Sequence, residues 1–535
     1  MKNHYLNRVA ALCVFALLVS VTTLGRAAII PVNPTNYQTA VSAAQPGDIL
    51  DFAAGDYFNR LSIRNKHGGP NAYITFRGPA TGARAVFHAN ACCNTINIGP
   101  ASYVKIQNFG VDGDGNDGSF AVSADDWSHH IEIEGLYIHD HAVRDDGTVV
   151  GDNQSTAIST KAPAAFWIIR NNVIQSPGIG MYLGNSDHTK DFVGGIIEGN
   201  LIANAIGYGM QIKAQGTSRD PEFSTVPGMA VGDEKTVIRH NVFMKDRDYA
   251  IAARPSLLVG GFPDSGSGSN DRYEIYGNFF YQNPDECLAQ LTGTVAFYGN
   301  VGYNTRGGCG VLFTAHDGRP LKNAWAYNNT IVTTGSGIRV SSPSLGSVQR
   351  ISGNAIFTAT PLSGGTQSDN VTGAYAAAAT YLNNPAAALG VLDLFPKAGQ
   401  LSGALFDRSA IQLFSDWNRD FNGAINDGTY RGAYAGSGTN PGWQLAATQK
   451  PIPSGAGVPV ITFSASPLTI PSGGATVLTW SSTNASSCAA SGGWSGSKAS
   501  SGTQSVTGIT TTTSYTLSCT GSTSSTSATV TVTAN

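Results

Sequence analysis

The chain has 535 residues, a formal net charge of −3 at pH 7 and only 13% charged residues, and it contains 64 glycines. This charge balance excludes a general attraction to nucleic acid or to an acidic membrane surface, so an anionic ligand would need local basic groups. The length exceeds that of an ordinary single domain, but it suits a repeat architecture that grows by adding units.

The first 27 residues have the pattern of a secretory signal peptide. Lys2 and Arg8 form a positive start, residues 9–25 are apolar, and Ala27 suits a cleavage site. Cys13 is followed by further apolar residues, which argues against a lipoprotein cleavage site. We therefore expect a secreted protein, extracellular or periplasmic, with no later stretch able to span a bilayer.

Residues 37–59 predict a short amphipathic helix, a Pro-Gly turn and a strand. In a solenoid the end coils must be covered, and this helix would cap the open N-terminal end. Strand-like segments at 72–78 and 101–113 would form the opening coils.

The DGDGNDG segment at 112–118 has Asp112, Asp114 and Asn116 at alternating positions, as a calcium loop has. Asp117 stands where glycine is wanted and the closing glutamate is missing, so a polar corner is the better interpretation. Residues 129–143, with His130, His139 and His141, fit another coil better than a zinc site.

A short motif built around an asparagine returns from residue 170 to residue 331. Successive asparagines are 28, 41, 37, 22 and 29 residues apart, and the segments between them hold short β runs without a helical apolar period. Such a period predicts an all-β parallel solenoid in which each coil contacts its neighbours. Asparagine tolerates the left-handed backbone of a sharp turn, and its amide can bond to the asparagines above and below. The ladder comprises Asn172, Asn200, Asn241, Asn278, Asn300 and Asn329.

A second motif, a small residue followed by a strand-like run, lies at 178–184, 207–213, 248–254, 286–291 and 309–314. Stacking these runs predicts one inward-facing column and, three residues further on, one outward-facing column. The inward column is Met181, Met210, Ile251, Leu288 and Val311. The outward column is Lys161, Gly184, Lys213, Arg254, Leu291 and Thr314.

In this register Lys213 and Arg254 lie on successive coils, about 4.8 Å apart in strand spacing. Two like charges at that separation repel unless an anion lies between them. The alternative is that both are ordinary solvated surface residues. The insertions at 214–236 and 255–271 follow these two residues, and each either walls a groove or is a harmless surface excursion.

The cysteines predict two disulfides. Cys287 and Cys309 are 22 residues apart, one coil, and we expect them to bridge neighbouring coils. A second bridge, Cys488–Cys519, would lie inside a C-terminal module. The adjacent Cys92 and Cys93 either form a vicinal bridge or stay reduced. A cysteine metal site is not expected, because no Cys-x-x-Cys or Cys/His cluster occurs.

The composition changes near residue 436. We expect a solenoid at 28–436, a Gly/Pro/Ser-rich linker at 437–457 and a small β-sandwich at 458–535, whose short alternating strands are rich in Ser and Thr. Trp480 and the Cys488–Cys519 pair would anchor its core. This part resembles the immunoglobulin-like modules appended to bacterial secreted enzymes.

The opening segment and the basic column together resemble the secreted polysaccharide lyases of the chondroitinase B and alginate lyase family (polysaccharide lyase family 6), over roughly residues 29–330. The resemblance implies a right-handed parallel β-helix that cleaves uronic-acid polymers by β-elimination, with a lysine as base and an arginine as acid. Lys213 in MQIKAQ and Arg254 in AIAARP match that pair. The family also binds calcium through a glutamate pair before the lysine. Ile206 and Tyr208 stand at those positions, so Ca²⁺ is only an alternative cofactor.

β-Elimination needs a base for the C5 proton, a partner for the carboxylate and a proton for the leaving oxygen. The base would be Lys213, with its pKa lowered by Arg254, and Arg254 would supply the acid or the carboxylate clamp. The expected substrate-binding residues are Lys161, Tyr182, Tyr208, Gln211 and His240. Tyr182, Tyr208 and His240 are also spare candidates for proton transfer, although His240, in a turn beside Asn241, fits a structural role better.

The leading hypothesis is a monomeric secreted lyase acting on an alginate-, chondroitin- or pectate-like polysaccharide. One alternative is a non-catalytic surface, adhesion or carbohydrate-binding protein built on a β-helix. The other is a glycoside hydrolase or epimerase on the same fold. Hydrolysis needs paired carboxylates, and the strand columns of 178–314 show no such pair.

Overall fold

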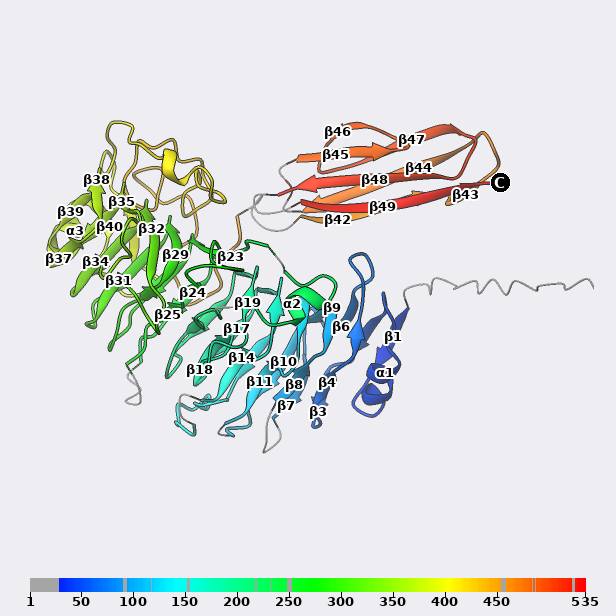
Figure 1. Ribbon diagram of the computed structural model, residues 1–535, viewed down its shortest axis with the longest axis horizontal. Coiled ribbons are helices and arrows are strands. Elements are labelled where there is room, and N and C mark those ends of the chain that lie inside the picture. The colour runs from blue at the N-terminus through cyan, green and yellow to red at the C-terminus, as the bar shows by residue number, and fades with distance from the viewer. Residues whose placement is uncertain are drawn as a thin grey trace, which may run out of the picture.

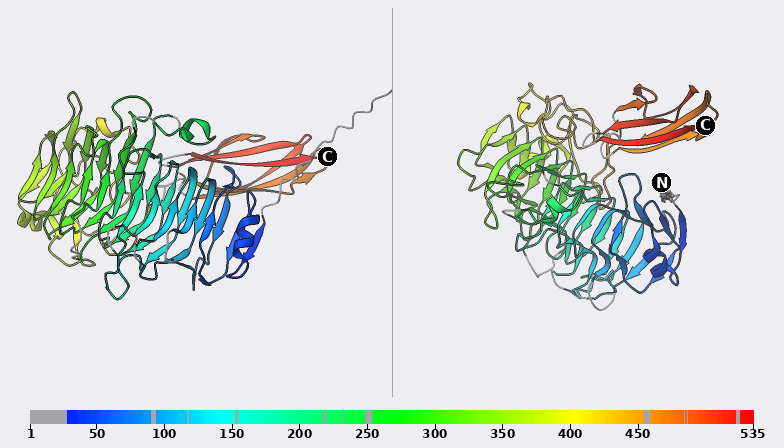
Figure 2. Two further views of the ribbon diagram at one scale, coloured as in Figure 1. Left: turned by 60° about the horizontal axis from the view of Figure 1, so that its bottom comes forward. Right: turned by 45° about the vertical axis from the view of Figure 1, so that its right-hand side comes forward.

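The computed structural model describes residues 28–89, 94–116, 118–151, 154–216, 219–230, 232–247, 253–453, 459–483, 485, 487–521 and 525–535. Most strands stack in three parallel sheets wound as a β-helix, which confirms the predicted fold class (Figure 1). The chain passes from sheet A to sheet B to sheet C and back, one coil at a time, and the coils lie side by side along the long axis (Figure 2).

Each sheet takes about one strand from each coil. Sheet A contains β1 (Ile29–Val32), β2 (Ile49–Phe52), β5 (Lys66–His67), β6 (Ile74–Arg77), β9 (Ala101–Gln107), β12 (Ser128–Glu134), β15 (Ala164–Ala165), β16 (Ile168–Arg170), β19 (Phe192–Val193), β20 (Ile196–Glu198), β23 (Lys235–Arg239), β26 (Arg272–Tyr276), β29 (Gly293–Tyr298), β32 (Leu321–Tyr327), β35 (Gln349–Ser352) and β38 (Thr366–Ser368). Sheet B contains β3 (Gly55–Tyr57), β7 (Ala85–His88), β10 (Phe109–Asp112), β13 (Tyr137–His139), β17 (Val173–Gln175), β21 (Leu201–Ala203), β24 (Val242–Met244), β27 (Phe279–Tyr281), β30 (Val301–Asn304), β33 (Thr330–Thr333), β36 (Ala355–Phe357) and β39 (Val371–Gly373). Sheet C contains β4 (Leu61–Ile63), β8 (Asn94–Ile98), β11 (Phe120–Ala124), β14 (Thr156–Thr160), β18 (Ile179–Leu183), β22 (Met210–Ile212), β25 (Leu257–Val259), β28 (Ala289–Leu291), β31 (Cys309–Phe313), β34 (Ser336–Val340) and β37 (Thr360–Ser363).

The N-terminal end of the solenoid is covered as the sequence predicts. Helix α1 (Tyr37–Ala43) buries Tyr37 and Val41 against the first coils, and the ring of Tyr37 meets the ring of Tyr57 edge-on at 5.4 Å between centroids. The helix lies at the blue end of the stack (Figure 1). Its apolar face replaces the coil that would otherwise precede β1, which keeps the first core layer away from water.

The asparagine ladder is present and longer than predicted. The side-chain amide of Asn172 donates to the carbonyl of Asn200 at 2.9 Å, and the same bond repeats along the column to Asn354 and Asn370. The ladder asparagines are not themselves left-handed. The residue before each one has the positive φ, as at His240 (54°) and Gly277 (64°). The turn conformation and the ladder are therefore carried by neighbouring residues.

The inward column of sheet C differs from the prediction in two of its five positions. The observed register runs Met181, Met210, Leu257, Ala289 and Val311, so Leu257 and Ala289 replace Ile251 and Leu288. Leu288 lies one residue before the column and is still buried in the core. Ile251 lies outside the described residues. The physical reason is that the extra residues of this coil come before β25, in the corner between sheets B and C.

Residues after the last coil fold back along the corner between sheets A and B. This segment contains η1 (Tyr375–Ala377), α3 (Ala378–Tyr381), β40 (Leu382–Asn384), β41 (Asp393–Pro396) and η2 (Ser409–Ile411). Residues 437–453, expected as part of a linker, belong to this covering segment, because Leu445 joins a core cluster with Phe421 and Tyr434. Residues 454–458 lie outside the described part of the chain.

The C-terminal module consists of two mainly antiparallel sheets, as expected for a small sandwich. One sheet holds β42 (Val460–Ser466), β44 (Gly474–Thr483) and β47 (Ser501–Ile509); the other holds β43 (Thr469–Ile470), β45 (Ser487–Gly492), β46 (Gly496–Lys498), β48 (Thr513–Thr520) and β49 (Ser525–Ala534). Trp480 and Trp494 meet in its core. The Cys488–Cys519 disulfide joins β45 and β48 within one sheet, whereas the immunoglobulin disulfide joins two sheets.

No helix among the described residues is both long and apolar enough to cross a membrane.

Candidate active site

The predicted basic column begins correctly on the outer edge of sheet C. Thr160, Leu183 and Ile212 are paired across β14, β18 and β22, so the next residues, Lys161, Gly184 and Lys213, follow in one column. Gly184 has a positive φ of 83°, and a side chain there would place its Cβ 3.3 Å from the Cβ of Lys213. A larger residue at this position would therefore crowd Lys213.

Tyr182 lies between the two ammonium groups. The Nζ atom of Lys161 is 4.9 Å from the centre of its ring, and the Nζ atom of Lys213 is 5.6 Å from it. The face of an aromatic ring attracts cations, so Tyr182 holds two like charges near each other on one outer face. The hydroxyl of Tyr182 bonds to Ser186, which fixes the ring.

Lys213 is half-buried, and its surroundings favour the neutral amine. Burial is the main cause that lowers the pKa of Lys213, and the positive charge of Arg254 acts in the same direction, while Asp317 acts against both. Burial also lowers the pKa of Lys161, whose ammonium lies 4.8 Å from the centre of the Phe120 ring. A lysine with a lowered pKa is neutral, and can accept a proton, at a lower pH than an ordinary lysine.

Arg254 does not occupy the column that the sequence predicts. The position that follows Lys213 there is Gly260, and Arg254 lies in the corner segment before β25. Its guanidinium is nevertheless on the same side, 5.6 Å from the centre of the Tyr208 ring. Lys245 and Asn283 both donate to the backbone carbonyl of Arg254, at 3.2 and 2.9 Å, which anchors the corner. Arg254 therefore comes near Lys213 because of the path of the corner, and not because the two residues share a strand column.

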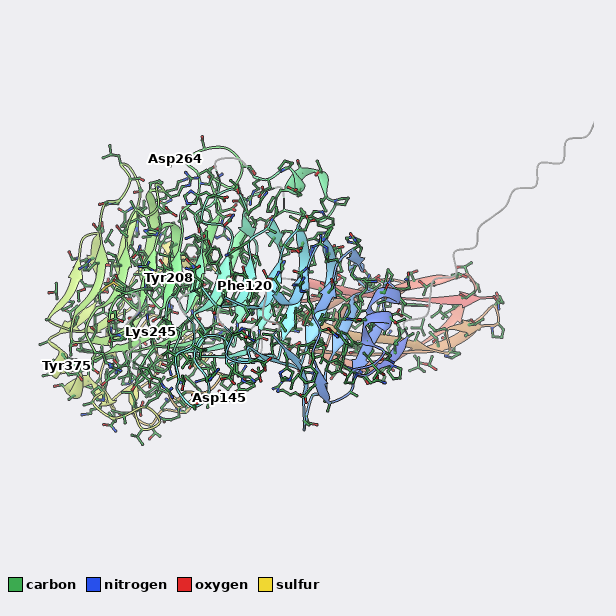
Figure 3. The ribbon with its side chains drawn as sticks, turned by 90° about the horizontal axis from the view of Figure 1, so that it is seen from below. Phe120, Asp145, Tyr208, Lys245, Asp264 and Tyr375 are labelled. Carbon is green, nitrogen blue, oxygen red and sulfur yellow. A yellow bond between two sulfur atoms is a disulfide. The ribbon has the colours of Figure 1, made fainter. Side chains whose placement is uncertain are left out.

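Tyr208 and Gln211 complete the group around Lys213. Gln211 is the partner of Tyr182 across β18 and β22, is almost fully buried, and faces the Nζ atom of Lys213 at 3.5 Å from its Oε1. Burial raises the pKa of Tyr208, although Arg254 works against this, so the phenol keeps its proton at neutral pH. Figure 3 shows Tyr208 and Phe120 along one side of the solenoid, several coils apart.

Asp317, whose charge acts on Lys213, escaped the sequence analysis, and so did its partner His188. Asp317 and His188 come from corners 129 residues apart and bond to each other, with 2.7 Å between Nε2 of His188 and the carboxylate. Burial works against it, but His188 and Lys213 together lower the pKa of Asp317. Asp317 follows the column residue Thr314 by three positions, and this spacing was the available signal.

His240 is not part of this group, which corrects its prediction as a substrate-binding residue. It lies at the corner between sheets A and B, is only 4% exposed, and its Nδ1 is 3.0 Å from the Nζ atom of Lys450 in the covering segment. Burial, Lys450 and Arg239 hold the pKa of His240 well below its usual range. A neutral, enclosed imidazole at that corner serves packing.

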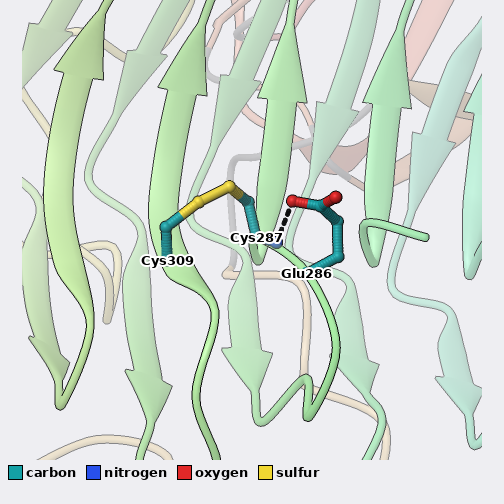
Figure 4. Close-up of side chains that lie close together, drawn as sticks. All are labelled: Glu286, Cys287 and Cys309. Carbon is teal, nitrogen blue, oxygen red and sulfur yellow. Dashed lines mark hydrogen bonds between the residues drawn. A yellow bond between two sulfur atoms is a disulfide. The ribbon is translucent and has the colours of Figure 1, made fainter. Parts of the chain in front are cut away.

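The disulfide Cys287–Cys309 is formed between neighbouring coils and confirms the predicted pair (Figure 4). Each cysteine stands two residues before a partner in the pairing of Ala289 with Val311, so the two cysteines share a column. Glu286 accepts a hydrogen bond from the backbone of Cys287 at 3.0 Å. Cys92 and Cys93 lie outside the described residues.

The insertion after Lys213 packs on sheet A. Its helix α2 (Glu222–Thr225) belongs to an apolar cluster in which Phe223 and Met229 pack with Ala165 and Val193. An ion pair of 2.9 Å between Lys190 and Asp220 ties it to the neighbouring corner. This segment is therefore a docked part of the solenoid wall next to the column.

The calcium set of the lyase family does not fit this site. Ile206 is fully buried and apolar, and Tyr208 offers a protonated phenol in place of a carboxylate. Within the described residues, the groups of His, Cys, Asp and Glu with metal-ligand spacing lie elsewhere. Calcium therefore has no step in the chemistry proposed below.

No protein-family model and no curated protein matches the chain. Among solved structures, it is similar to the PL6 family alginate lyase AlyGC, with 13% identity and a TM-score of 0.33 over 81% of this chain and 61% of that one. It is also similar to the tailspike protein of E. coli bacteriophage HK620, with 10% identity and a TM-score of 0.30 over 64% of this chain and 74% of that one.

A further similar structure is the tailspike protein gp49 from Acinetobacter baumannii bacteriophage Fri1, a capsular polysaccharide depolymerase, with 8% identity and a TM-score of 0.30 over 95% of this chain and 78% of that one. The chain spans 61% of the length of the alginate lyase that it matches. At these identities and TM-scores the similarities carry no argument about the site.

Proposed function

We propose that the chain is a secreted polysaccharide lyase that cleaves a uronate-containing polysaccharide by β-elimination. The observation that carries the proposal is the cationic group on the outer side of sheet C. Lys161, Lys213 and Arg254 surround Tyr182 and Tyr208, and burial lowers the pKa of Lys213. Such a group suits a polymer that has a carboxylate on the sugar ring to be cleaved.

In the proposed reaction the neutral amine of Lys213 removes the proton from C5 of the uronate. The electron pair forms the C4–C5 double bond, and the bond from C4 to the glycosidic oxygen breaks. The developing charge on the carboxylate is stabilised by Arg254, whose planar guanidinium can bind both oxygens, while Lys161 helps to bind the polymer before the reaction.

The leaving oxygen needs a proton, and Tyr208 is the better donor of the two candidates. Its pKa is raised by burial, so it carries a proton at the pH where Lys213 is partly neutral. The guanidinium of Arg254 keeps its proton far more firmly, and this places Arg254 in the role of clamp.

The acidic residue near Lys213 argues against hydrolysis at this site. A glycosidase needs a carboxylic acid whose pKa is raised so that it can protonate the leaving group. Asp317, whose charge reaches both Lys213 and Tyr208, instead has its pKa lowered and is engaged with His188.

The test is to incubate the purified chain with alginate, pectate, chondroitin and glucuronan, and to follow the ultraviolet absorbance of the new C4–C5 double bond. Growth of that absorbance on one polymer supports the lyase. New reducing ends without absorbance would show a hydrolase. If neither signal appears on any of the polymers while the chain binds one of them, it is a carbohydrate-binding protein.

A further inference from the structure

A group of imidazoles and carboxylates lies on sheet B, on a different face from Lys213. His88 ends β7, Asp112 ends β10 and His139 ends β13. Strand pairing places Asp112 beside His88 on one side and beside His139 on the other. Neighbouring strands are about 4.8 Å apart, so these side chains stand next to one another. With Asp114 and Asp140 they form what we call the Asp112 cluster.

The donor atoms of the Asp112 cluster converge in two overlapping triads. His88, Asp112 and Asp114 offer ligand atoms that all lie within 4.8 Å of one another, and so do Asp112, His139 and Asp140. The Nδ1 atom of His88 is 2.9 Å from Asp114 and 3.9 Å from Asp112, and the Nδ1 atom of His139 is 3.0 Å from Asp140. Asp112 belongs to both triads.

Both imidazoles are held in place by an aromatic neighbour. The ring of Phe58 stacks on His88 at 4.8 Å between centroids, and the ring of Tyr137 stacks on His139 at 4.5 Å. The side chains of His88 and His139 are only 17% and 15% exposed. These rings are thus oriented in advance, each with Nδ1 toward the carboxylates, and water can still reach the edge of the cluster.

The cluster also concentrates negative charge. Asp56 lies 3.2 Å from Nε2 of His88, and Asp145 lies 3.9 Å from Nδ1 of His139, which brings five carboxylates to two imidazoles. Arg144 is a nearby cation, beside Gly115. A bound cation would relieve the repulsion among these carboxylates.

We propose that the Asp112 cluster binds a divalent transition-metal ion of the Zn²⁺ class at the triad of Asp112, His139 and Asp140, whose ligand atoms all lie within 4.8 Å of one another. Imidazole together with carboxylate suits zinc and its neighbours, whereas calcium takes six to eight oxygen ligands. The ion would tie two neighbouring coils together near the N-terminal end, which gives it a structural role.

Binding of Zn²⁺ to the full purified chain, treated first with a chelator, would be measured by titration calorimetry, with Ca²⁺ in a parallel arm. We expect saturable Zn²⁺ binding in the micromolar range or tighter and no comparable binding of Ca²⁺. Asp112→Asn and His139→Asn should weaken Zn²⁺ binding by about 10–100-fold or more. Loss of a residue that only hydrogen-bonds to a metal ligand already lowers metal affinity by that factor, and these two residues would be ligands themselves.

A matched control is His67→Asn. His67 is an exposed histidine on β5 that stacks on Trp127 and does not touch the cluster, so its loss should leave Zn²⁺ binding unchanged. Circular dichroism, and recovery of the Cys287–Cys309 disulfide by peptide mapping, would show that each variant is folded.

Substitution with Co²⁺ tests the ligand type. Nitrogen and oxygen ligands give weak visible bands, whereas thiolate ligands add an intense ultraviolet band. The proposal predicts the visible bands alone, and their loss in Asp112→Asn. Equal Zn²⁺ affinity in the wild type and a folded Asp112→Asn variant would overturn it, as would Ca²⁺ binding as tight as Zn²⁺ binding or a thiolate band that persists in that variant.

Discussion

Lys213 and Lys161 occupy equivalent positions in their coils but have different surroundings. Lys213 is half-buried and shares its space with Gln211, Tyr182, Arg254 and the charge of Asp317, whereas Lys161 is exposed beside Phe120. Burial lowers the pKa of both amines, but the positive charge of Arg254 lowers that of Lys213 further, and Lys213 also lies next to the hydrogen-bond acceptor of Gln211. This difference assigns Lys213 as the proposed base and Lys161 as a binding residue.

Substitution separates these roles. Lys213→Ala should lower kcat by about 10²–10⁴-fold on whichever polymer the wild type cleaves, because positioned proton transfer contributes that factor. Arg254→Ala should cost about 10²–10³-fold through loss of the carboxylate clamp. Lys161→Ala is the matched control and should act mainly on KM. Near-normal kcat in both Lys213→Ala and Arg254→Ala would move the site elsewhere.

The pH dependence of kcat follows from the charges around Lys213. The base works only as the neutral amine, so kcat should rise with pH and level off above the lowered pKa of Lys213. Asp317 raises that pKa, so Asp317→Asn should move the rising limb toward lower pH. A pH profile of kcat for both proteins measures the shift, and a limb that moves toward higher pH would contradict this assignment of charges.

At the scale of elements, the asparagine ladder ties one coil to the next through buried amides. The Oδ1 atom of Asn241 accepts from both the backbone and the side chain of Asn200, and its Nδ2 donates to Ile197 and Asn278. Every donor has a partner, and the column therefore stabilises the corner between sheets A and B. A break in it leaves several buried groups without partners at once.

Asn241→Ala should lower the free energy of unfolding by about 2–5 kcal/mol, because more than one buried group loses its hydrogen bond at about 1–3 kcal/mol each. Asn370→Ala, at the partly exposed last position of the ladder, is the matched control and should cost less. Denaturant unfolding followed by circular dichroism compares the two. Equal losses would mean that the buried middle of the ladder contributes nothing beyond its end.

In the molecule as a whole, the covering segment, which follows the last coil and ends at residue 453, packs along the outside of the β-helix. Leu445 packs with Phe421 and Tyr434, and Gln449 donates to the carbonyl of Gly199 on the ladder corner. Lys450 is buried over the ring of Phe421, where burial lowers its pKa to about 7. A segment with the composition of a linker thus closes one edge of the β-helix.

Two truncations test this boundary. A chain that ends at Pro453 keeps the covering segment and should unfold at the same temperature as the solenoid in the full chain. A chain that ends at Gly436 loses the burial of Leu445, worth about 1.5–3 kcal/mol, and uncovers His240, so its Tm should fall. Differential scanning calorimetry measures both. If the shorter chain has the same Tm, residues 437–453 act only as a linker.

The features that repeat along the chain could be predicted from its residues alone. The solenoid, the asparagine ladder, the Cys287–Cys309 disulfide and the column of Lys161 with Lys213 follow from residues spaced by whole coils. The capping helix and the Cys488–Cys519 disulfide were predicted from local patterns outside the repeat. In a stack of coils, neighbours in space are neighbours in the repeat, so a regular spacing places the side chains directly.

The paths of the irregular corners could not be predicted from residue spacing and are known from the folded chain. An insertion can precede or follow a strand, and this choice moved Arg254 out of the strand column while keeping it beside Tyr208. Asp317 and His188 meet across 129 residues, and Lys450 covers His240 across 210 residues. The path of a corner depends on packing against other coils and on the chain that folds back over them, and no periodic pattern in the sequence encodes either.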